Sequence, residues 1–308
     1  MFSQIISELK QKIGQFPEKD QIMFNNRLID ISQDKFQPIL PLKSSSTIAF
    51  VDGGQAEIIS ASNFSLSFIR VFAQVFQNNQ KKKSYRHEFY LLTTAKLIGK
   101  ELMYESKIYP LNEKLIEEEE LLISSTDPSI KIGFKPASCS QVANIARRLT
   151  ELALAKKVNA ELILLDGTLE PTYYSEKNYL PNPKFNSLAK TSHLLTVSGN
   201  SLGQLLNKIT YLGTWYYHLE GQTYFVKLHP RAKHVFRFEG NPEILPTLME
   251  NSQDGLFLGY PYGLIFADKF ARVSNQELNS LKTRFLLNKE IQPYLNDTNA
   301  HKILDQMN

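Results

Sequence analysis

Two apolar segments of this 308-residue chain each run into an aspartate that is followed by glycine. One covers residues 47–51 and leads into Asp52-Gly53-Gly54, and the other covers residues 162–165 and leads into Asp166-Gly167-Thr168. A continuous apolar run bounded by glycine is typical of a strand buried on both faces, so each carboxylate is expected where its strand leaves the core. An Asp-Gly pair is also a common turn sequence, and each segment could be no more than a turn.

If the two strands are parallel neighbours, Asp52 and Asp166 lie side by side. Like charges at that distance repel and raise a pKa unless a cation neutralises them. Carboxylate oxygens are the ligands that hard divalent cations prefer. The pattern therefore predicts a metal site built from oxygen ligands.

Composition narrows the class of protein without naming a function. Lysine and arginine exceed aspartate and glutamate by only four, so net charge does not identify a nucleic-acid binder. Cys139 is the only cysteine, which excludes an internal disulfide and fits a reducing cytosol. It is expected to be a small buried or semi-exposed residue, with a nucleophilic role as the alternative. The N-terminus lacks the features of a secretory signal, and no apolar run approaches the ~20 residues of a membrane span, so a soluble cytoplasmic protein is expected.

The N-terminal segment carries Ile5, Ile6, Leu9 and Ile13 at helical spacing. This spacing predicts an amphipathic helix that docks on the body of the protein or on a partner.

The residues after the first aspartate are rich in β-branched and aromatic side chains. Residues 56–61, 64–76 and 85–94 are separated by short polar segments, which predicts that the first strand opens an antiparallel meander of three. The glutamate run at residues 117–120 is expected to be the solvent-exposed face of a helix, with an acidic metal trap as the alternative.

A helix is predicted over residues 140–157, because its apolar residues recur at intervals of three and four. It leads within a few residues into the second aspartate-ending strand, as in a crossover between parallel strands. Farther on, residues 213–219 and 223–228 flank a glycine-containing connection and predict a hairpin. Helices are expected over residues 264–273, which include Asp268, and over residues 275–287.

The acidic residues follow an order that is typical of RNase H-like nucleases. Asp52 ends a strand, two further strands follow, a helix carries Glu151, Asp166 ends a parallel strand, and a late helix carries Asp268. The predicted fold is α/β, a mixed sheet flanked by helices with insertions and extra terminal helices. Carboxylates from separate elements can hold two metal ions about 3.5–4 Å apart, which activate water and stabilise the leaving oxygen in phosphodiester cleavage.

Six motifs in this order resemble those of the NurA nucleases of archaea and some bacteria, which act with the hexameric translocase HerA in DNA end resection. The motifs are residues 50–54, 147–151, 164–169, 188–201, 226–232 and 259–268, and the resemblance spans about residues 46–275. The chain departs from the family at Gly263, where a proline is usual, and at Asp268, where histidine is frequent. Residues 98–129 do not align and are interpreted as an insertion.

The resemblance implies a role for each of several residues. Asp52 and Asp166 would be shared metal ligands, Glu151 the helix ligand, and Asp268 the last ligand or a water-orienting group. Mn²⁺ or Mg²⁺ would be bound, as two ions. Tyr260 would place its hydroxyl near the scissile phosphate, and Lys190 would neutralise a phosphate oxygen. Tyr260 as a loop anchor and Lys190 as an ordinary surface cation are the alternatives.

DNA contacts are expected from a second set of side chains. The predicted set is Arg148, Lys190, His229 and Arg231 on the backbone, with Trp215 or a neighbouring tyrosine stacked on an unpaired base. The alternative is that the hairpin aromatics belong to the core and the basic residues form its solvated edge.

Three regions are predicted: an N-terminal helical extension over residues 1–45, a nuclease domain over 46–275 and a C-terminal helical tail over 276–308. The resemblance implies a homodimeric, metal-dependent DNA nuclease, with single-strand endonuclease and 5′–3′ exonuclease activity, docked on HerA. The alternatives are a catalytically inactive clamp or adaptor and another RNase H-fold enzyme, such as a resolvase or an RNase.

Overall fold

The computed structural model describes residues 1–291 except 14–19, 43–44, 132 and 134. The chain forms two compact units. Unit 1 contains residues 1–45, 166–168 and 186–262, and unit 2 contains residues 46–165, 169–185 and the chain from residue 263 onward. Each unit has its own sheet strands and its own hydrophobic core.

Unit 2 is built on a mixed sheet with the strand order β9-β4-β5-β6-β7-β8. Its strands are β4 (Ile48–Ala61), β5 (Phe64–Gln77), β6 (Gln80–Ile98), β7 (Glu101–Pro110), β8 (Ile123–Ser124) and β9 (Leu162–Asp166). Neighbours from β4 to β8 are antiparallel, whereas β9 runs parallel to β4 with Leu165 opposite Val51. The predicted meander and the parallel return strand are therefore confirmed. The segment interpreted as an insertion supplies β7, which extends the meander by one strand.

Turn chemistry fixes the long hairpins of this sheet. Asn78 and Asn79 connect β5 to β6 with φ values of 50° and 58°. Asparagine tolerates this left-handed conformation better than most residues, and two such residues in a row make the tight turn that suits twisted strands. The polar segment that separates two apolar runs in the sequence is thus a two-residue hairpin loop.

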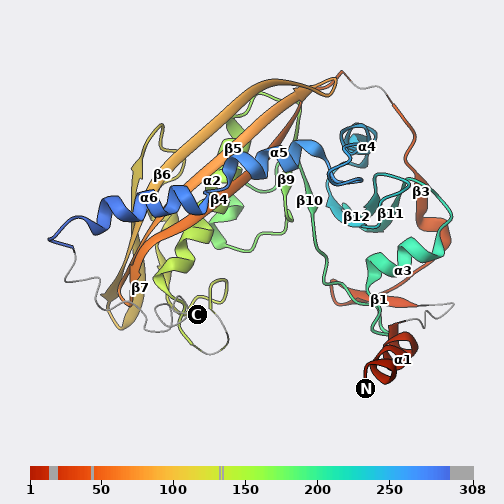
Figure 1. Ribbon diagram of the computed structural model, residues 1–308, viewed down its shortest axis with the longest axis horizontal. Helices are drawn as coiled ribbons and strands as arrows, with labels where there is room; N and C mark the ends of the chain where they lie inside the picture. The colour runs from red at the N-terminus through yellow and green to blue at the C-terminus, as the bar shows by residue number, and fades with distance from the viewer. Residues whose placement is uncertain (14–19, 43–44, 132, 134, 292–308) are drawn as a thin grey trace. The chain divides into compact units, whose positions relative to one another are not determined.

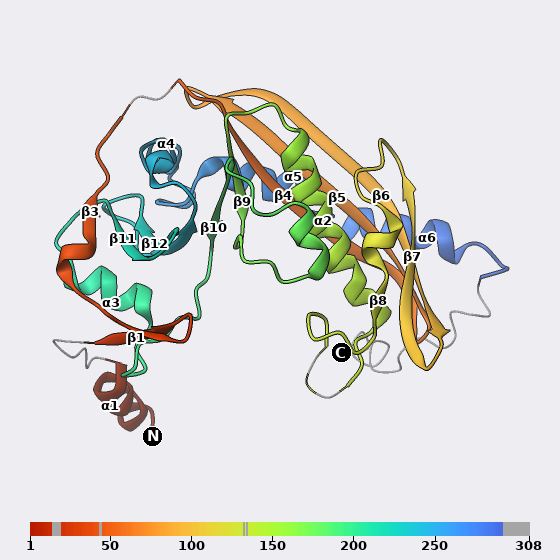
Figure 2. The ribbon, with the colours of Figure 1, turned by 180° about the vertical axis from the view of Figure 1, so that it is seen from behind.

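Helices cover both faces of the β4–β6 region. Figures 1 and 2 show α2 (Val142–Lys157) on one face, and α5 (Tyr262–Ala271) with α6 (Asn275–Leu286) on the other. Side chains alternate along a strand. Ala49 and Val51 join the core under α2, while Phe50 lies against Gly263 of α5. Burial of each large aliphatic side chain of α2 contributes about 1.5–3 kcal/mol, which explains why its 3.6-residue periodicity is so regular.

The glutamate run does not form the exposed face of a helix, and that prediction is wrong. It makes a single 3₁₀ turn over Glu118–Leu121, with a capping box between Glu117 and Glu120. The Glu118 carboxylate accepts the backbone N–H of Ile108 at 2.9 Å, and Glu120 accepts the hydroxyl of Tyr179 at 3.0 Å. Burial, together with the Glu120 carboxylate, raises the pKa of Tyr179 far above its usual range.

Unit 1 contains an antiparallel series of strands with the order β3-β11-β12-β13-β10. They are β3 (Phe36–Pro38), β10 (Phe185–Ala189), β11 (Trp215–Glu220), β12 (Thr223–Lys227) and β13 (Phe236–Glu239). β1 (Gln21–Phe24) and β2 (Arg27–Asp30) pair as a separate hairpin, and the helices are α1 (Phe2–Ile13), α3 (Leu202–Ile209) and α4 (Leu245–Asn251). The hairpin predicted around Gly221 is confirmed as β11–β12.

The terminal segments differ in part from the predictions. α1 forms as expected, and Ile5, Ile6 and Leu9 are exposed on it. The rest of the N-terminal region contains strands β1 to β3, so it is not a purely helical extension. At the other end α6 is present, and residues 292–308 of the predicted tail lie outside the described residues.

Four short 3₁₀ turns complete the described elements: η1 (Gln33–Lys35), η3 (Cys139–Gln141), η4 (Tyr174–Asn178) and η5 (Pro242–Ile244). Cys139 is buried, as expected, and burial raises the pKa of its thiol.

Among the described helices, none combines the length and the apolar run that crossing a bilayer requires.

Candidate functional site

Asp52 lies inside strand β4, not at its end. The strand continues for 14 residues to Ala61, so the prediction that Asp52 marks the strand end is wrong. The side chain is 6% exposed, and its Oδ1 accepts the N–H of Gly53 at 2.7 Å. Its cross-strand partner on β5 is Phe72, whose ring packs against Phe270 of α5 at 5.2 Å. Because directly paired residues share a face, the carboxylate points to the α5 side of the sheet.

Gly53 and Gly54 keep β4 extended because helices approach it from both sides. A Cβ atom on Gly53 would lie 2.5 Å from Oε1 of Glu151 on α2. A Cβ atom on Gly54 would lie 2.3 Å from the carbonyl oxygen of Ala271, the last residue of α5. Glycine permits this close approach of neighbouring groups. The two glycines therefore bring both helices next to Asp52.

Helix α5 runs along the face of β4 that carries Asp52. Gly263 lies over Phe50, where a Cβ atom would be 2.2 Å from the ring, and Ala271 lies over Gly54. Asp52 is the residue between Phe50 and Gly54 on that face. The middle of α5 holds the buried Ala267, and Asp268 follows it. Gly263 thus allows the close packing of the helix that bears Asp268.

Asp268 is paired within its own helix. Its Oδ2 accepts Nη2 of Arg272 at 2.8 Å, and 36% of its side chain is exposed. A half-exposed pair four residues apart on a helix is held weakly. The ion pair with Arg272 therefore adds little to the stability of the helix.

The Glu151 carboxylate is clamped by two arginines of its own helix. It is 3% exposed, with Nη1 of Arg147 at 2.5 Å and Nη1 of Arg148 at 3.7 Å. Arg147 also donates to the carbonyl oxygen of Gly53 at 3.3 Å, which ties Glu151 to the backbone beside Asp52. Arg148 in turn pairs with the buried Glu176 at 3.1 Å.

This network extends into the loop after β9. Glu176 accepts the backbone N–H groups of Thr172 and Tyr173 at 3.0 and 3.1 Å. Burial, the main cause, raises the pKa of the Tyr173 phenol. Only 12% of the Arg148 side chain is exposed, and its guanidinium is engaged with the carboxylates of Glu151 and Glu176. The prediction that Arg148 contacts DNA is therefore wrong; it holds Glu151 and Glu176 in place.

Unit 1 brings together the other three predicted catalytic residues. Nζ of Lys190 lies 2.6 Å from Oδ2 of Asp166 and 5.6 Å from the ring centroid of Tyr260. The Tyr260 hydroxyl donates to Oδ1 of Asp166 over a long 3.5 Å. Tyr260 is 2% exposed and its ring packs against Phe236. Its hydroxyl is therefore held beside Asp166. Lys190 is 45% exposed on its side chain and can turn to a ligand.

The donor chemistry fits a hard divalent cation. Leu165 lies opposite Val51 in neighbouring parallel strands, and an aspartate follows each of them in the sequence. The available ligands are carboxylate oxygens, which suit Mg²⁺ and Mn²⁺. Basic side chains compensate two of these charges, Arg147 at Glu151 and Lys190 at Asp166. Across the described ranges, no three His, Cys, Asp or Glu side chains are gathered closely enough to form a metal cluster.

Two of the predicted DNA contacts are buried. Trp215 is 0% exposed and its ring packs edge-on against Phe36 at 5.0 Å, so it cannot stack on a base. His229 is 7% exposed, and its Nδ1 accepts the backbone N–H of Arg231 at 3.1 Å. Burial and the charges of Arg231 and Lys227 lower the pKa of His229, so it is neutral at pH 7. Both predictions are wrong, whereas Arg231 is exposed and its role stays a prediction.

No family model and no curated protein sequence matches the chain. Its structure is similar to the crystal structure of the NurA nuclease from Sulfolobus solfataricus, with a TM-score of 0.51 and 11% identity over 95% of this chain and 93% of that one. The chain has the NurA nuclease fold. A second NurA crystal structure is similar with a TM-score of 0.47 and 11% identity, over 85% of this chain and 93% of that one. A Ciona intestinalis endonuclease V bound to inosine-containing DNA is similar with a TM-score of 0.41 and 12% identity, over 91% of this chain and 99% of that one.

The likeness confirms the resemblance in fold and the predicted α/β class, a mixed sheet flanked by helices. Sequence reasoning missed several residues that shape the site. Arg147 and Arg148 stand four and three residues before Glu151, a spacing that could have predicted their ion pairs. Glu176 lies in the short 3₁₀ turn η4, far from Arg148 in the sequence, and gives no such signal. The contacts of Gly54 and Gly263 depend on α5, which is distant in the sequence.

Proposed function

We propose that this protein is a metal-dependent nuclease that cleaves DNA. One observation carries the proposal: in a chain with the NurA fold, the buried Asp52 lies on a strand whose two glycines admit Glu151 from one side and the Asp268 helix from the other. Buried carboxylates are costly unless a cation or hydrogen bonds compensate them.

Asp52, Glu151, Asp166 and Asp268 would hold Mn²⁺ or Mg²⁺, as two ions. When bound, such ions supply an activated water and stabilise the charge on the leaving oxygen. We propose Asp52 and Asp166 as shared ligands because each directly follows an apolar strand segment in the sequence. Glu151 is already fixed in orientation by Arg147 and Arg148, so little ordering is required of it on binding.

Lys190 and Tyr260 would act through the charge at Asp166. With substrate bound, the ammonium of Lys190 can move from Asp166 to a phosphate oxygen and stabilise its developing charge. The Tyr260 hydroxyl would then keep Asp166 oriented, since its ring is fixed in the core of unit 1. In this proposal Tyr260 positions Asp166 and has no direct contact with the phosphate.

The finer activity that we propose is that of the NurA family: single-strand endonuclease and 5′–3′ exonuclease cleavage in DNA end resection, as a homodimer docked on HerA. The exposed Ile5, Ile6 and Leu9 of α1 support a docking role for that helix. Replacement of Ile6 and Leu9 by serine is expected to abolish the dimer or the co-purification with HerA while DNA cleavage persists. An unchanged assembly with an earlier thermal transition would contradict this role.

The activity is tested on labelled single- and double-stranded DNA with Mn²⁺, with Mg²⁺ and with EDTA. We expect cleavage with a divalent cation, none with EDTA, and a loss on the order of 10²–10³-fold for Asp52→Asn, because the metal supplies several kcal/mol of transition-state stabilisation. Equal cleavage by wild type and Asp52→Asn would refute the site. No cleavage by wild type of any DNA or RNA, with intact binding, would instead favour the clamp or adaptor.

A further inference from the structure

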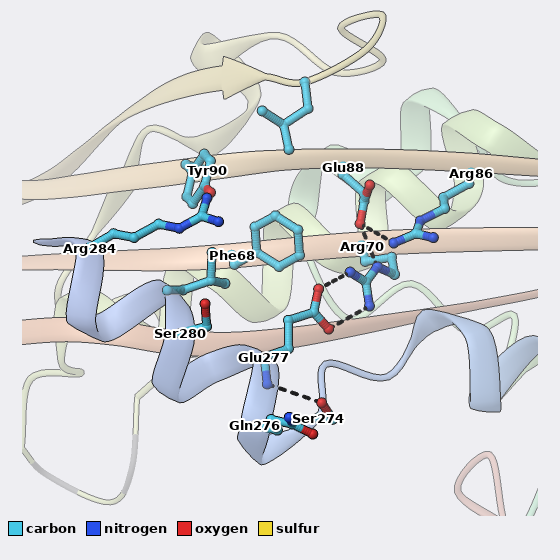
Figure 3. A pocket seen from close by; sticks show the side chains of 12 residues that line it. Phe68, Arg70, Arg86, Glu88, Tyr90, Ser274, Gln276, Glu277, Ser280 and Arg284 are labelled. Atoms are coloured by element: carbon cyan, nitrogen blue, oxygen red, sulfur yellow. Dashed lines mark hydrogen bonds and ion pairs between the residues drawn. The ribbon is translucent and has the colours of Figure 1, made fainter.

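Unit 2 contains a pocket of about 470 Å³ between the β5–β6 strands and α6. Figure 3 shows Arg86 and Arg284 at its two ends and Arg70 between them, with the rings of Phe68 and Tyr90 in its wall. Three arginines and two glutamates line the pocket, so it carries an excess of positive charge. None of these residues belongs to the carboxylate site proposed above.

Arg70 is the buried centre of this pocket. Its side chain is 6% exposed and donates to Glu88 at 2.6 Å through Nε and to both carboxylate oxygens of Glu277. A further hydrogen bond runs from Nη1 to the carbonyl oxygen of Arg272 at 3.1 Å. The carboxylate of Glu277 is thereby kept charged, and its pKa is lowered by the hydrogen bond from Arg70. One guanidinium therefore contacts both carboxylates of the pocket.

The two outer arginines are more exposed than Arg70 and can reach a ligand. Arg86 shares Oε1 of Glu88 with Arg70, at 2.7 Å, and half of its side chain remains exposed. Arg284 is exposed on α6 and forms no ion pair with any residue that the structure describes. A guanidinium presents a planar fork of donors that matches phosphate oxygens. The hydroxyl group of Ser280 adds a further donor on the α6 side.

The length of the pocket distinguishes among phosphate ligands. Arg86 and Tyr90 are four residues apart on β6, which corresponds to about 13 Å at 3.3 Å per residue. This distance exceeds what a single phosphate group needs, and it suits a strand with successive phosphates. Tyr90 is half-buried in the wall of the pocket, where its ring packs against Phe68 at 5.3 Å.

We propose that this pocket binds the phosphate backbone of a single-stranded segment of nucleic acid, with Arg86 and Arg284 as the phosphate contacts. The inference rests on the proposed nuclease function and adds a substrate-holding site outside the carboxylate centre. Arg70 fixes Glu88 and Glu277, and through Glu88 it orients Arg86.

The test measures binding of a fluorescent oligothymidylate by fluorescence anisotropy, in EDTA so that cleavage does not interfere. Arg86→Ala and Arg284→Ala are each expected to weaken binding about fivefold at 0.1 M salt and to make the negative slope of log affinity against log salt shallower by about 0.7. Lys282→Ala removes a charge from the same helix outside the pocket lining and is the matched control. Thermal unfolding checks that each variant is folded.

Each outcome decides the proposal. Weaker binding by both arginine variants with a normal control supports it. Wild-type affinity in both arginine variants, or an equal loss of affinity in Lys282→Ala, overturns the proposed role of the pocket. The proposed nuclease function still stands in that case if the wild-type protein cleaves DNA. If thymidine monophosphate competes as effectively as an unlabelled oligothymidylate, the pocket binds a free nucleotide. This result would overturn the proposal that it binds a strand. A wild-type protein that neither binds nor cleaves nucleic acid would defeat both proposals.

Discussion

Asp52-Gly53-Gly54 and Asp166-Gly167-Thr168 look alike in the sequence but differ in the structure. The first lies inside a strand of 14 residues, with extended glycines pressed between two helices. The second ends strand β9, and Gly167 has a φ of 101° with open space around its Cβ position. The first glycines serve close packing, and the second serves a turn. A glycine after aspartate thus ends a strand only where nothing in the rest of the chain packs against it.

The carboxylates beside these glycines also differ in environment. Glu151, next to Gly53, belongs to a buried network of two arginines and Glu176. Asp166 is held by one half-exposed lysine and a long hydrogen bond. The first arrangement is rigid and costly to break, while the second can change partners when a ligand binds.

The largest effect is expected from breaking the buried network. Arg148→Met leaves Glu176 buried without its cation and should lower the free energy of unfolding by about 3–5 kcal/mol. Lys190→Met removes a half-exposed partner and should cost about 0–1 kcal/mol. Urea denaturation of both variants measures the difference. Equal losses would show that the two environments do not differ as described.

A smaller effect separates the two kinds of glycine. Gly54→Asn forces a side chain against the backbone of Ala271 and should cost about 1–3 kcal/mol. Gly167→Asn should cost less than about 1 kcal/mol, because asparagine tolerates positive φ and the site is open. The same denaturation experiment compares them. A larger cost at Gly167 would reverse the distinction.

The smallest effect concerns the pH dependence of the ion pair between Arg70 and Glu277. The hydrogen bond from Arg70 lowers the pKa of Glu277 below its ordinary value of 4.5. A lowered folded-state pKa contributes stability that is fully present above 4.5 and is lost as the pH falls through the folded-state value. The melting temperature of wild type should therefore exceed that of Glu277→Gln at neutral pH, and the gap should close in acid. A gap that does not change with pH would contradict a charged Glu277.

Local periodicity predicted much of unit 2. The meander, helix α2 and the parallel β9 follow from side-chain patterns within each segment, since each buries a regular face. The sequence also indicated Asp52, Glu151, Asp166 and Asp268 as candidates, because their residue types and order are informative.

Contacts between distant segments could not be predicted in this way. The extension of β4 through Gly53 and Gly54 depends on α2 and α5, and the burial of Trp215 depends on β3, far away in the chain. Arg148 was assigned to DNA because its charge was visible while its partner Glu176 was not. Basic and aromatic residues alone do not distinguish a binding surface from a satisfied core.

The most direct test of the account is calorimetric titration of Mn²⁺ into wild type, Asp52→Asn, Asp166→Asn and the double variant. If the two aspartates share an ion, each single variant should weaken binding at the strongest site by at least about tenfold, and the double variant should lose less binding free energy than the sum of the two single losses. Unchanged binding in either single variant, or losses that add fully in the double variant, would contradict a shared metal site.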